Sequence, residues 1–151
     1  MGLKERITEE IQIATKAKDK VRLETVRSIK KAILEKEASV RPQGQEALTE
    51  TQEIEVVTQL AKQRRDAIKQ YQNANRLDLA EQESQELAIL SEYLPQQLSD
   101  AEIAAAIDQI IAQVGATAPK DMGKVMGSAM QQLKGKADGK KVQEIVKARL
   151  G

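Results

Sequence analysis

The sequence predicts an all-α protein with an N-terminal helical-hairpin domain followed by a small three-helix C-terminal domain. Aromatic residues make up only 1% of the chain, and neither Phe nor Trp occurs. The core must therefore consist of Leu, Ile, Val, Ala and Met, which together with the many Gln, Glu and Lys residues favour helix. Apolar residues also recur at spacings of three and four, the period of one helix face. A length of 151 residues suits one domain or two small ones.

The chain contains no Cys and no His, and these absences restrict its chemistry. They exclude thiolate nucleophiles, Ser-His-Asp arrangements and the common zinc or iron sites. Carboxylates, Lys and Ser remain as catalytic candidates, but no cluster of them stands out. We therefore expect no catalytic residue, no metal and no cofactor. No apolar run approaches the ~20 residues that cross a bilayer. We expect a cytoplasmic protein without a membrane partner.

The first part of the chain is predicted to form a helical hairpin. Leu3, Ile7 and Ile11 lie on one face of a first helix, and Asp19 is placed to cap a second one. Two helices joined by so short a turn should pack antiparallel. Residues 38–47 contain Arg-Pro-Gln-Gly without periodicity and are predicted to form a mobile loop.

A second pair of helices is predicted to follow this loop. Thr49 and Gln52 form a capping box that starts a long helix. Arg64 falls within the apolar sector of that helix, and Glu83 falls within the inward face of the next one, from about 78 to 94. We predict an Arg64–Glu83 ion pair between the two antiparallel helices, with a structural role.

A domain boundary is predicted at Pro95, because the residue before a proline is pushed out of helical geometry. The N-terminal helical domain then spans 1–94, and the three-helix domain spans 95–151. Each of the three helices has a side chain placed to accept its free backbone N–H groups. These predicted N-caps are Ser99, Asp121 and Asp138.

The last two helices begin in an unusual way, with Asp followed by Gly and then by Lys in the first turn. Lysine is unexpected there, because a helix N-terminus already carries partial positive charge. Glycine lets backbone N–H groups approach a ligand closely, so an anionic partner, most simply phosphate, would explain both features. The candidate nucleic-acid-binding residues are Lys120, Gly123, Lys124, Lys134, Lys136, Gly139, Lys140 and Lys141.

The charge distribution supports a polyanionic partner. Residues 115–151 hold eight Lys/Arg and three acids, for a net charge of +5, whereas the whole chain carries +1. Contacts made by lysine and backbone groups recognise phosphate rather than bases, and the only arginine of this region is Arg149. A folded RNA therefore fits better than sequence-specific DNA. The competing interpretation is that the glycines permit tight turns and the lysines are only solvated.

Several stretches, taken in order, resemble the GatB/YqeY family, and within it the stand-alone YqeY-like proteins. The resemblance covers nearly the whole chain, and the combination is specific although each stretch alone is weak. It implies an all-α fold whose three-helix domain is similar to the tail of the B subunit of tRNA-dependent amidotransferases. The matching stretches are Lys62–Asp66, Arg76–Ala80, Tyr93–Ser99, Asp121–Met126 and Gly135–Gly139.

In those amidotransferases the tail helps to hold the tRNA, and amide transfer takes place in a larger domain that nothing in this chain resembles. The resemblance implies a tRNA-binding accessory module that is non-catalytic by itself. Amidotransferase subunits or an aminoacyl-tRNA synthetase are its candidate protein partners. One alternative is a component of a carbon–nitrogen ligase that uses glutamine as amido-N-donor. Another is a helical protein-interaction adaptor that presents exposed apolar residues such as Ile13 or Val21.

Overall fold

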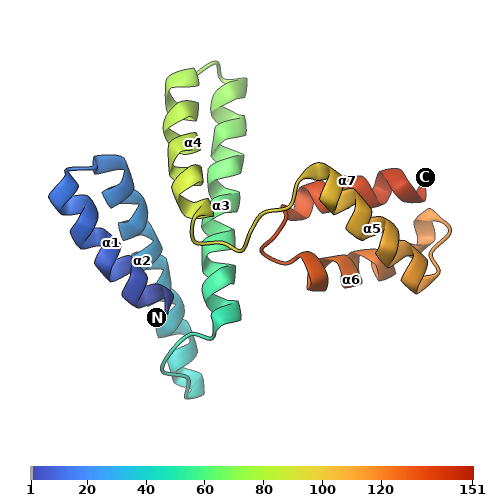
Figure 1. Ribbon diagram of the computed structural model, residues 1–151, viewed down its shortest axis with the longest axis horizontal. Coiled ribbons are helices and arrows are strands. Elements are labelled where there is room, and N and C mark those ends of the chain that lie inside the picture. Colours follow the sequence, from blue (N-terminus) through green and yellow to red (C-terminus); the bar gives the residue numbers. More distant parts are fainter. Residues whose placement is uncertain (1) are drawn as a thin grey trace. The chain divides into compact units, whose positions relative to one another are not determined.

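The computed structural model describes residues 2–151, and all regular structure within that range is helical, as the sequence predicts. None of the described helices is both long and apolar enough to cross a membrane. Figure 1 shows the elements in chain order, which are α1 (Leu3–Ala17), α2 (Lys20–Val40), η1 (Arg41–Gln43), α3 (Glu50–Asn73), α4 (Leu77–Ser91), α5 (Asp100–Val114), η2 (Pro119–Asp121), α6 (Met122–Leu133) and α7 (Gly139–Leu150).

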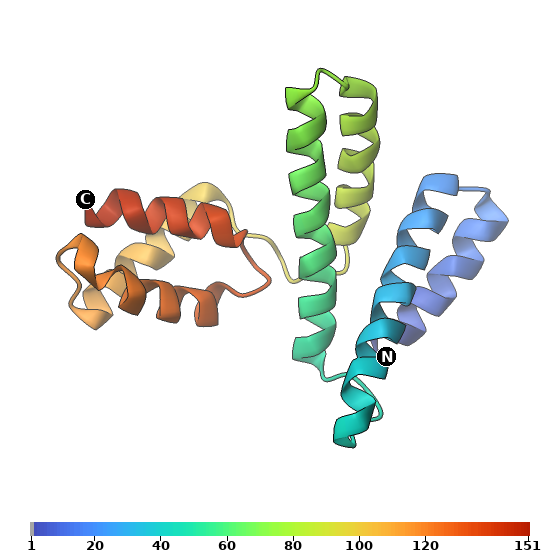
Figure 2. The same ribbon diagram turned by 180° about the vertical axis from the view of Figure 1, so that it is seen from behind.

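Contacts between Cα atoms divide the chain into two compact units, an N-terminal unit (1–95) and a C-terminal unit (96–151). The N-terminal unit consists of two antiparallel hairpins, α1–α2 and α3–α4, and α2 packs against both helices of the second hairpin (Figures 1 and 2). Each helix contributes to one shared core. The most deeply buried side chains, at most 1% exposed, include Ile7, Ile29, Ile33, Val57 and Leu90.

Helix α1 has no N-cap of its own, and α3 supplies the missing acceptor. Gly2 precedes α1 and makes no side-chain hydrogen bond there. Instead the Leu3 N–H donates to Glu53 Oε2 at 2.8 Å, and Glu53 lies fifty positions further along the chain. A carboxylate at a helix N-terminus also interacts favourably with the helix dipole. This contact ties the start of α1 to α3 within the N-terminal unit.

The prediction of a loop at 38–47 is wrong for residues 38–43, which are helical. Helix α2 continues to Val40, and η1 occupies the next three residues. Val40 is only 6% exposed and extends the buried stripe of Ile33 by two more turns, which favours helix over loop. Gly44 then adopts a φ of +86°, a left-handed geometry that glycine accepts without strain. The irregular segment ends at Thr49, whose predicted capping box with Gln52 is present.

The C-terminal unit packs three helices around a separate core. Its start is held by the predicted Ser99 cap, which accepts the Glu102 N–H at 3.2 Å. Gly115 ends α5 at a φ of +69°. The chain then reverses twice, so that α6 runs antiparallel to both neighbours. The buried side chains of this core are Ile103, Ile107, Ile110, Val125, Ala129, Leu133, Val142, Val146 and Leu150.

Two ion pairs show that α5 and α7 run parallel. Lys141 Nζ lies 2.8 Å from Asp100 Oδ1 near the start of both helices. Arg149 Nε lies 3.1 Å from Asp108 Oδ1, eight residues further along each helix. The second pair lies eight residues after the first on both helices, and this equal spacing in the same direction requires a parallel arrangement.

Candidate nucleic-acid interface

The two glycine-containing helix starts lie at opposite ends of the C-terminal unit. The turn before α7 lies beside the start of α5, because the Leu98 N–H donates to the Lys136 carbonyl at 2.9 Å and Gln97 Nε2 donates to the Gly135 carbonyl at 2.6 Å. The start of α6 follows the far end of α5, where η2 contacts α7. The 12 residues of α6 separate the two starts, a distance of about 18 Å.

The two turns therefore cannot contact one and the same phosphate group. In a bundle whose neighbouring helices run antiparallel, successive helix starts alternate between its two ends. The first end carries Lys120, Gly123 and Lys124, and the second carries the other predicted contacts. Those contacts are Lys134, Lys136, Gly139, Lys140 and Lys141.

At the first end, Asp121 does not cap α6 as predicted. Its carboxylate turns back and accepts the N–H groups of Thr117 at 3.0 Å and Ala118 at 3.3 Å. The hydrogen bond from Thr117 is the main cause that holds the pKa of Asp121 below its ordinary value. The physical reason is that η2 runs directly into α6. Helical geometry therefore starts at Pro119, and the Met122 N–H already donates to the Pro119 carbonyl.

The backbone N–H groups near Gly123, which were predicted to approach a ligand, therefore do not lie in the first turn of the helical segment. What the first end does offer is an open surface with cationic side chains. Gly123 is exposed, and a methyl group added to it would meet no atom within 4 Å. The ammonium groups of Lys120 and Lys124 are exposed and form no ion pair within residues 2–151. Lys147, in the last turn of α7, is likewise exposed without such a pair.

At the second end, charges are offset within the protein. Asp138 caps α7 as predicted and accepts the Lys140 N–H at 3.4 Å. The Asp100 carboxylate binds the Lys141 ammonium, and this hydrogen bond raises the pKa of Lys141. Lys134 and Lys140 also interact with other groups of the protein. Lys136 is the remaining cation of this turn, exposed and without an ion pair among the described residues.

The predicted Arg64–Glu83 ion pair is present, and a second carboxylate joins it. Arg64 Nε lies 3.4 Å from Glu83 Oε2 and 3.5 Å from Glu86 Oε2, between α3 and α4. The three side chains are 18%, 22% and 13% exposed. Glu86 was missed, although its i,i+3 spacing from Glu83 places both on one helix face. Among the described residues no group of acids is arranged to hold a metal ion.

Glu86 makes the stability of the N-terminal unit depend on pH. Burial is the main cause that raises the pKa of Glu86, and the nearby carboxylates of Glu83 and Glu24 add to it, while Arg64 opposes it. A carboxyl group with a raised pKa in the folded state stabilises that state when protonated. That contribution is present below its unfolded pKa and is lost as the pH rises through the folded value.

We therefore expect Glu86→Gln to be more stable than the wild type at pH 7. The difference should shrink as the pH is lowered towards about pH 4, where wild-type Glu86 also becomes neutral. Urea unfolding of both proteins at several pH values measures this. A variant less stable than the wild type at neutral pH would show that the ionised Glu86 carboxylate is a net stabilising partner of Arg64.

These features define a class of protein, a small all-α protein whose C-terminal three-helix unit presents lysines that the fold does not neutralise. A family model described as Yqey-like protein matches residues 4–150. The chain therefore belongs to the YqeY-like family. No curated protein matches the chain.

Proposed function

We propose that the protein binds folded RNA, tRNA above all, through the end of its C-terminal unit at which α6 begins. The observation that carries the proposal is that Lys120, Lys124 and Lys147 lie at this end, exposed and without an ion pair within residues 2–151. Cations that no carboxylate offsets add repulsion to the folded protein. A nucleic acid removes that repulsion, and its released counterions drive binding.

The side chains at this end suit the phosphate backbone rather than the bases. Lysine is a compact point charge that attracts phosphate without a fixed geometry. Gly123 adds to this surface an exposed backbone position with no side chain of its own, which a sugar-phosphate strand can approach. Neither of the two tyrosines offers a stacking platform, because Tyr93 is 9% exposed and Tyr71 is half-buried. Recognition of RNA by shape is therefore favoured over stacking of single-stranded bases.

The resemblance to the amidotransferase tail supports tRNA as the RNA in question. In this proposal the protein is an accessory module without catalytic activity of its own. Its polar side chains at the helix starts support that role, because Ser99 and Asp138 cap helices and Asp121 accepts hydrogen bonds from the loop before α6. Amidotransferase subunits or an aminoacyl-tRNA synthetase would be the proteins with which such a module shares a tRNA.

The double variant Lys120→Glu/Lys124→Glu tests the proposed surface. We expect it to weaken tRNA binding by about tenfold or more at low salt, and to reduce the salt slope by roughly one to two, as expected for two lost phosphate contacts. Titration with tRNA at several salt concentrations, followed by fluorescence anisotropy, measures both quantities. The substituted side chains are exposed, so the helical circular dichroism should be unchanged.

A matched control makes the same charge change elsewhere. Lys62→Glu/Lys69→Glu alters two exposed lysines on α3, outside the proposed surface, and should leave affinity and slope close to those of the wild type. The single variant Lys136→Glu reports on the other end of the C-terminal unit. Absence of tRNA binding by the wild type at low salt would refute the proposal. Equal losses in both double variants would refute the assigned surface.

A further inference from the structure

A groove lies between α2 and α3 in the N-terminal unit, outside the surface assigned to RNA. Its volume is about 630 Å³. The lining residues recur every three or four positions along both helices, over three helical turns, a length of about 16 Å. Ala32 contributes to its floor from α2, and Val56 and Leu60 from α3. The last two side chains are only partly buried, although they pack against the core.

A second hollow adjoins this groove on the outer side of α2. The two share Lys31 and Glu35, so they meet along one ridge of the helix. Leu34 lies in the outer hollow and is 45% exposed. A groove with apolar residues at Ala32, Val56 and Leu60, next to an exposed leucine and rimmed by polar residues, is the kind of surface that marks a binding site for another macromolecule.

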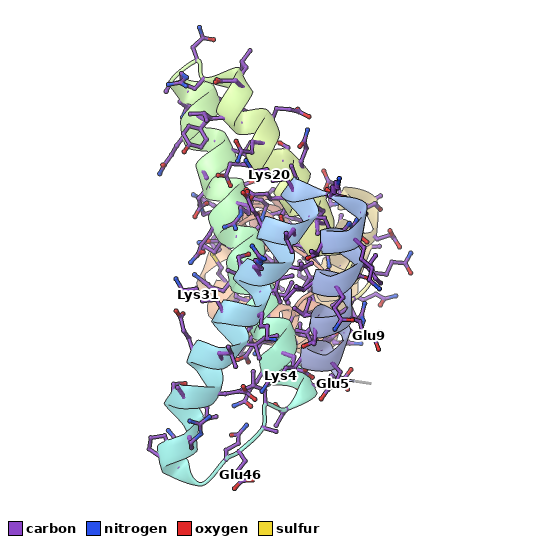
Figure 3. The ribbon with its side chains drawn as sticks, turned by 90° about the vertical axis from the view of Figure 1, so that its left-hand side faces the viewer. Lys4, Glu5, Glu9, Lys20, Lys31 and Glu46 are labelled. Atoms are coloured by element: carbon purple, nitrogen blue, oxygen red, sulfur yellow. The ribbon has the colours of Figure 1, made fainter. Side chains whose placement is uncertain are left out.

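Cations outnumber the two acids, Glu35 and Glu55, around this surface. Arg27 and Lys30 border the outer hollow, Lys36 borders the groove, and Lys31 borders both. None of the four forms an ion pair within residues 2–151. Figure 3 shows Lys31 on α2, and its side chain is exposed.

We propose that the α2–α3 groove and the adjoining Leu34 hollow together bind an amphipathic helix of a protein partner, one that carries Asp and Glu beside its apolar face. Two helical walls and an apolar floor suit a helix laid lengthwise, as in other helix-in-groove complexes. Charge complementarity selects an acidic partner, since Arg27, Lys31 and Lys36 form no ion pair within residues 2–151.

RNA fits this surface poorly. Phosphate gains nothing from Val56, Leu60 or the exposed Leu34, whereas an amphipathic helix can bury apolar side chains against them. The proposal is thus independent of RNA binding at the C-terminal unit, and the two can fail separately.

Two synthetic peptides of about 20 residues, long enough to form helix, serve as probes. Both carry the same leucine face, and one has Glu while the other has Lys at the flanking positions. NMR titration of the full chain should show saturable shifts around Leu34 and Leu60 with the acidic peptide and none with the basic one. Leu34→Asp should weaken binding of the acidic peptide by about tenfold or more, because a buried leucine contact is lost.

Leu77→Asp is the matched control, because Leu77 is also an exposed leucine, 63% accessible, at the start of α4. It should leave binding of the acidic peptide unchanged. Circular dichroism of both variants checks that they are folded. The proposal is overturned if the acidic peptide causes no shifts at millimolar concentration, if both peptides bind equally, or if Leu34→Asp has no effect. Shifts of the same amides by tRNA instead of the acidic peptide would also overturn it.

Discussion

Replacing Arg64 with alanine is expected to lower the free energy of unfolding by about 3 kcal/mol, because it leaves half-buried carboxylates without their cation. Glu83 and Glu86 both face the Arg64 guanidinium, and all three side chains are at most 22% exposed. The loss should appear as a lower urea midpoint with an unchanged m-value. The long stem of Arg64 also covers apolar surface between α3 and α4, which adds to the effect.

Two further variants separate the electrostatic cause from lost packing. Arg76→Ala breaks an ion pair with Asp78 in the same hairpin, but those side chains are 57% and 67% exposed, and little or no change is expected. Adding Glu83→Gln and Glu86→Gln to Arg64→Ala should recover much of the lost stability, because no stranded charge remains. If the triple variant is as unstable as Arg64→Ala alone, the loss comes from packing.

Ile107→Ala is expected to have a comparably large effect, about 2–5 kcal/mol, concentrated in the C-terminal unit. Ile107 lies in the middle of α5 and is fully buried in the separate core of residues 96–151. A unit of this size has little stability to spare. Amide hydrogen exchange should therefore show protection lost throughout α5, α6 and α7, while α1 to α4 keep theirs.

Met130→Ala serves as the control for this substitution, because Met130 lies in the same unit but is 40% exposed. It should lower the free energy of unfolding far less than Ile107→Ala does. The experiment also tests the prediction of two domains. If protection is lost equally in α1 to α4, the two units unfold together, and the chain is a single cooperative domain despite its two cores.

Local features of the fold were predictable from the sequence because they depend on residues close together in the chain. The capping boxes at Thr49 and Ser99 and the cap at Asp138 are all present. Each needs only an acceptor side chain two or three residues before the amide that it binds. The Arg64–Glu83 pair was predictable for a related reason, since two antiparallel helices bring their inward faces together.

Asp121 shows where this local reasoning fails. The Asp-Met-Gly-Lys order fits a cap, but Pro119 starts a 3₁₀ turn two residues earlier and moves the beginning of the helix. The carboxylate then lies in the third helical position and accepts N–H groups that precede the turn. The same short run of residues fits Asp121 as an N-cap and Asp121 as the third residue of a helical segment. Only the path of the chain after α5 selects between these two geometries.

The amino-acid sequence alone indicates that the chain is helical, where most of its helices begin and end, and that residues 115–151 carry a net charge of +5. These properties follow from side-chain periodicity and from caps, which act within a few residues. Only the tertiary structure decided which lysines are neutralised and at which end each one lies. Asp100 and Asp108 form ion pairs with Lys141 and Arg149 because α5 and α7 run parallel, whereas Lys120 and Lys124 form none within residues 2–151. Charges interact through space, and positions forty residues apart in the chain meet only after the helices have packed.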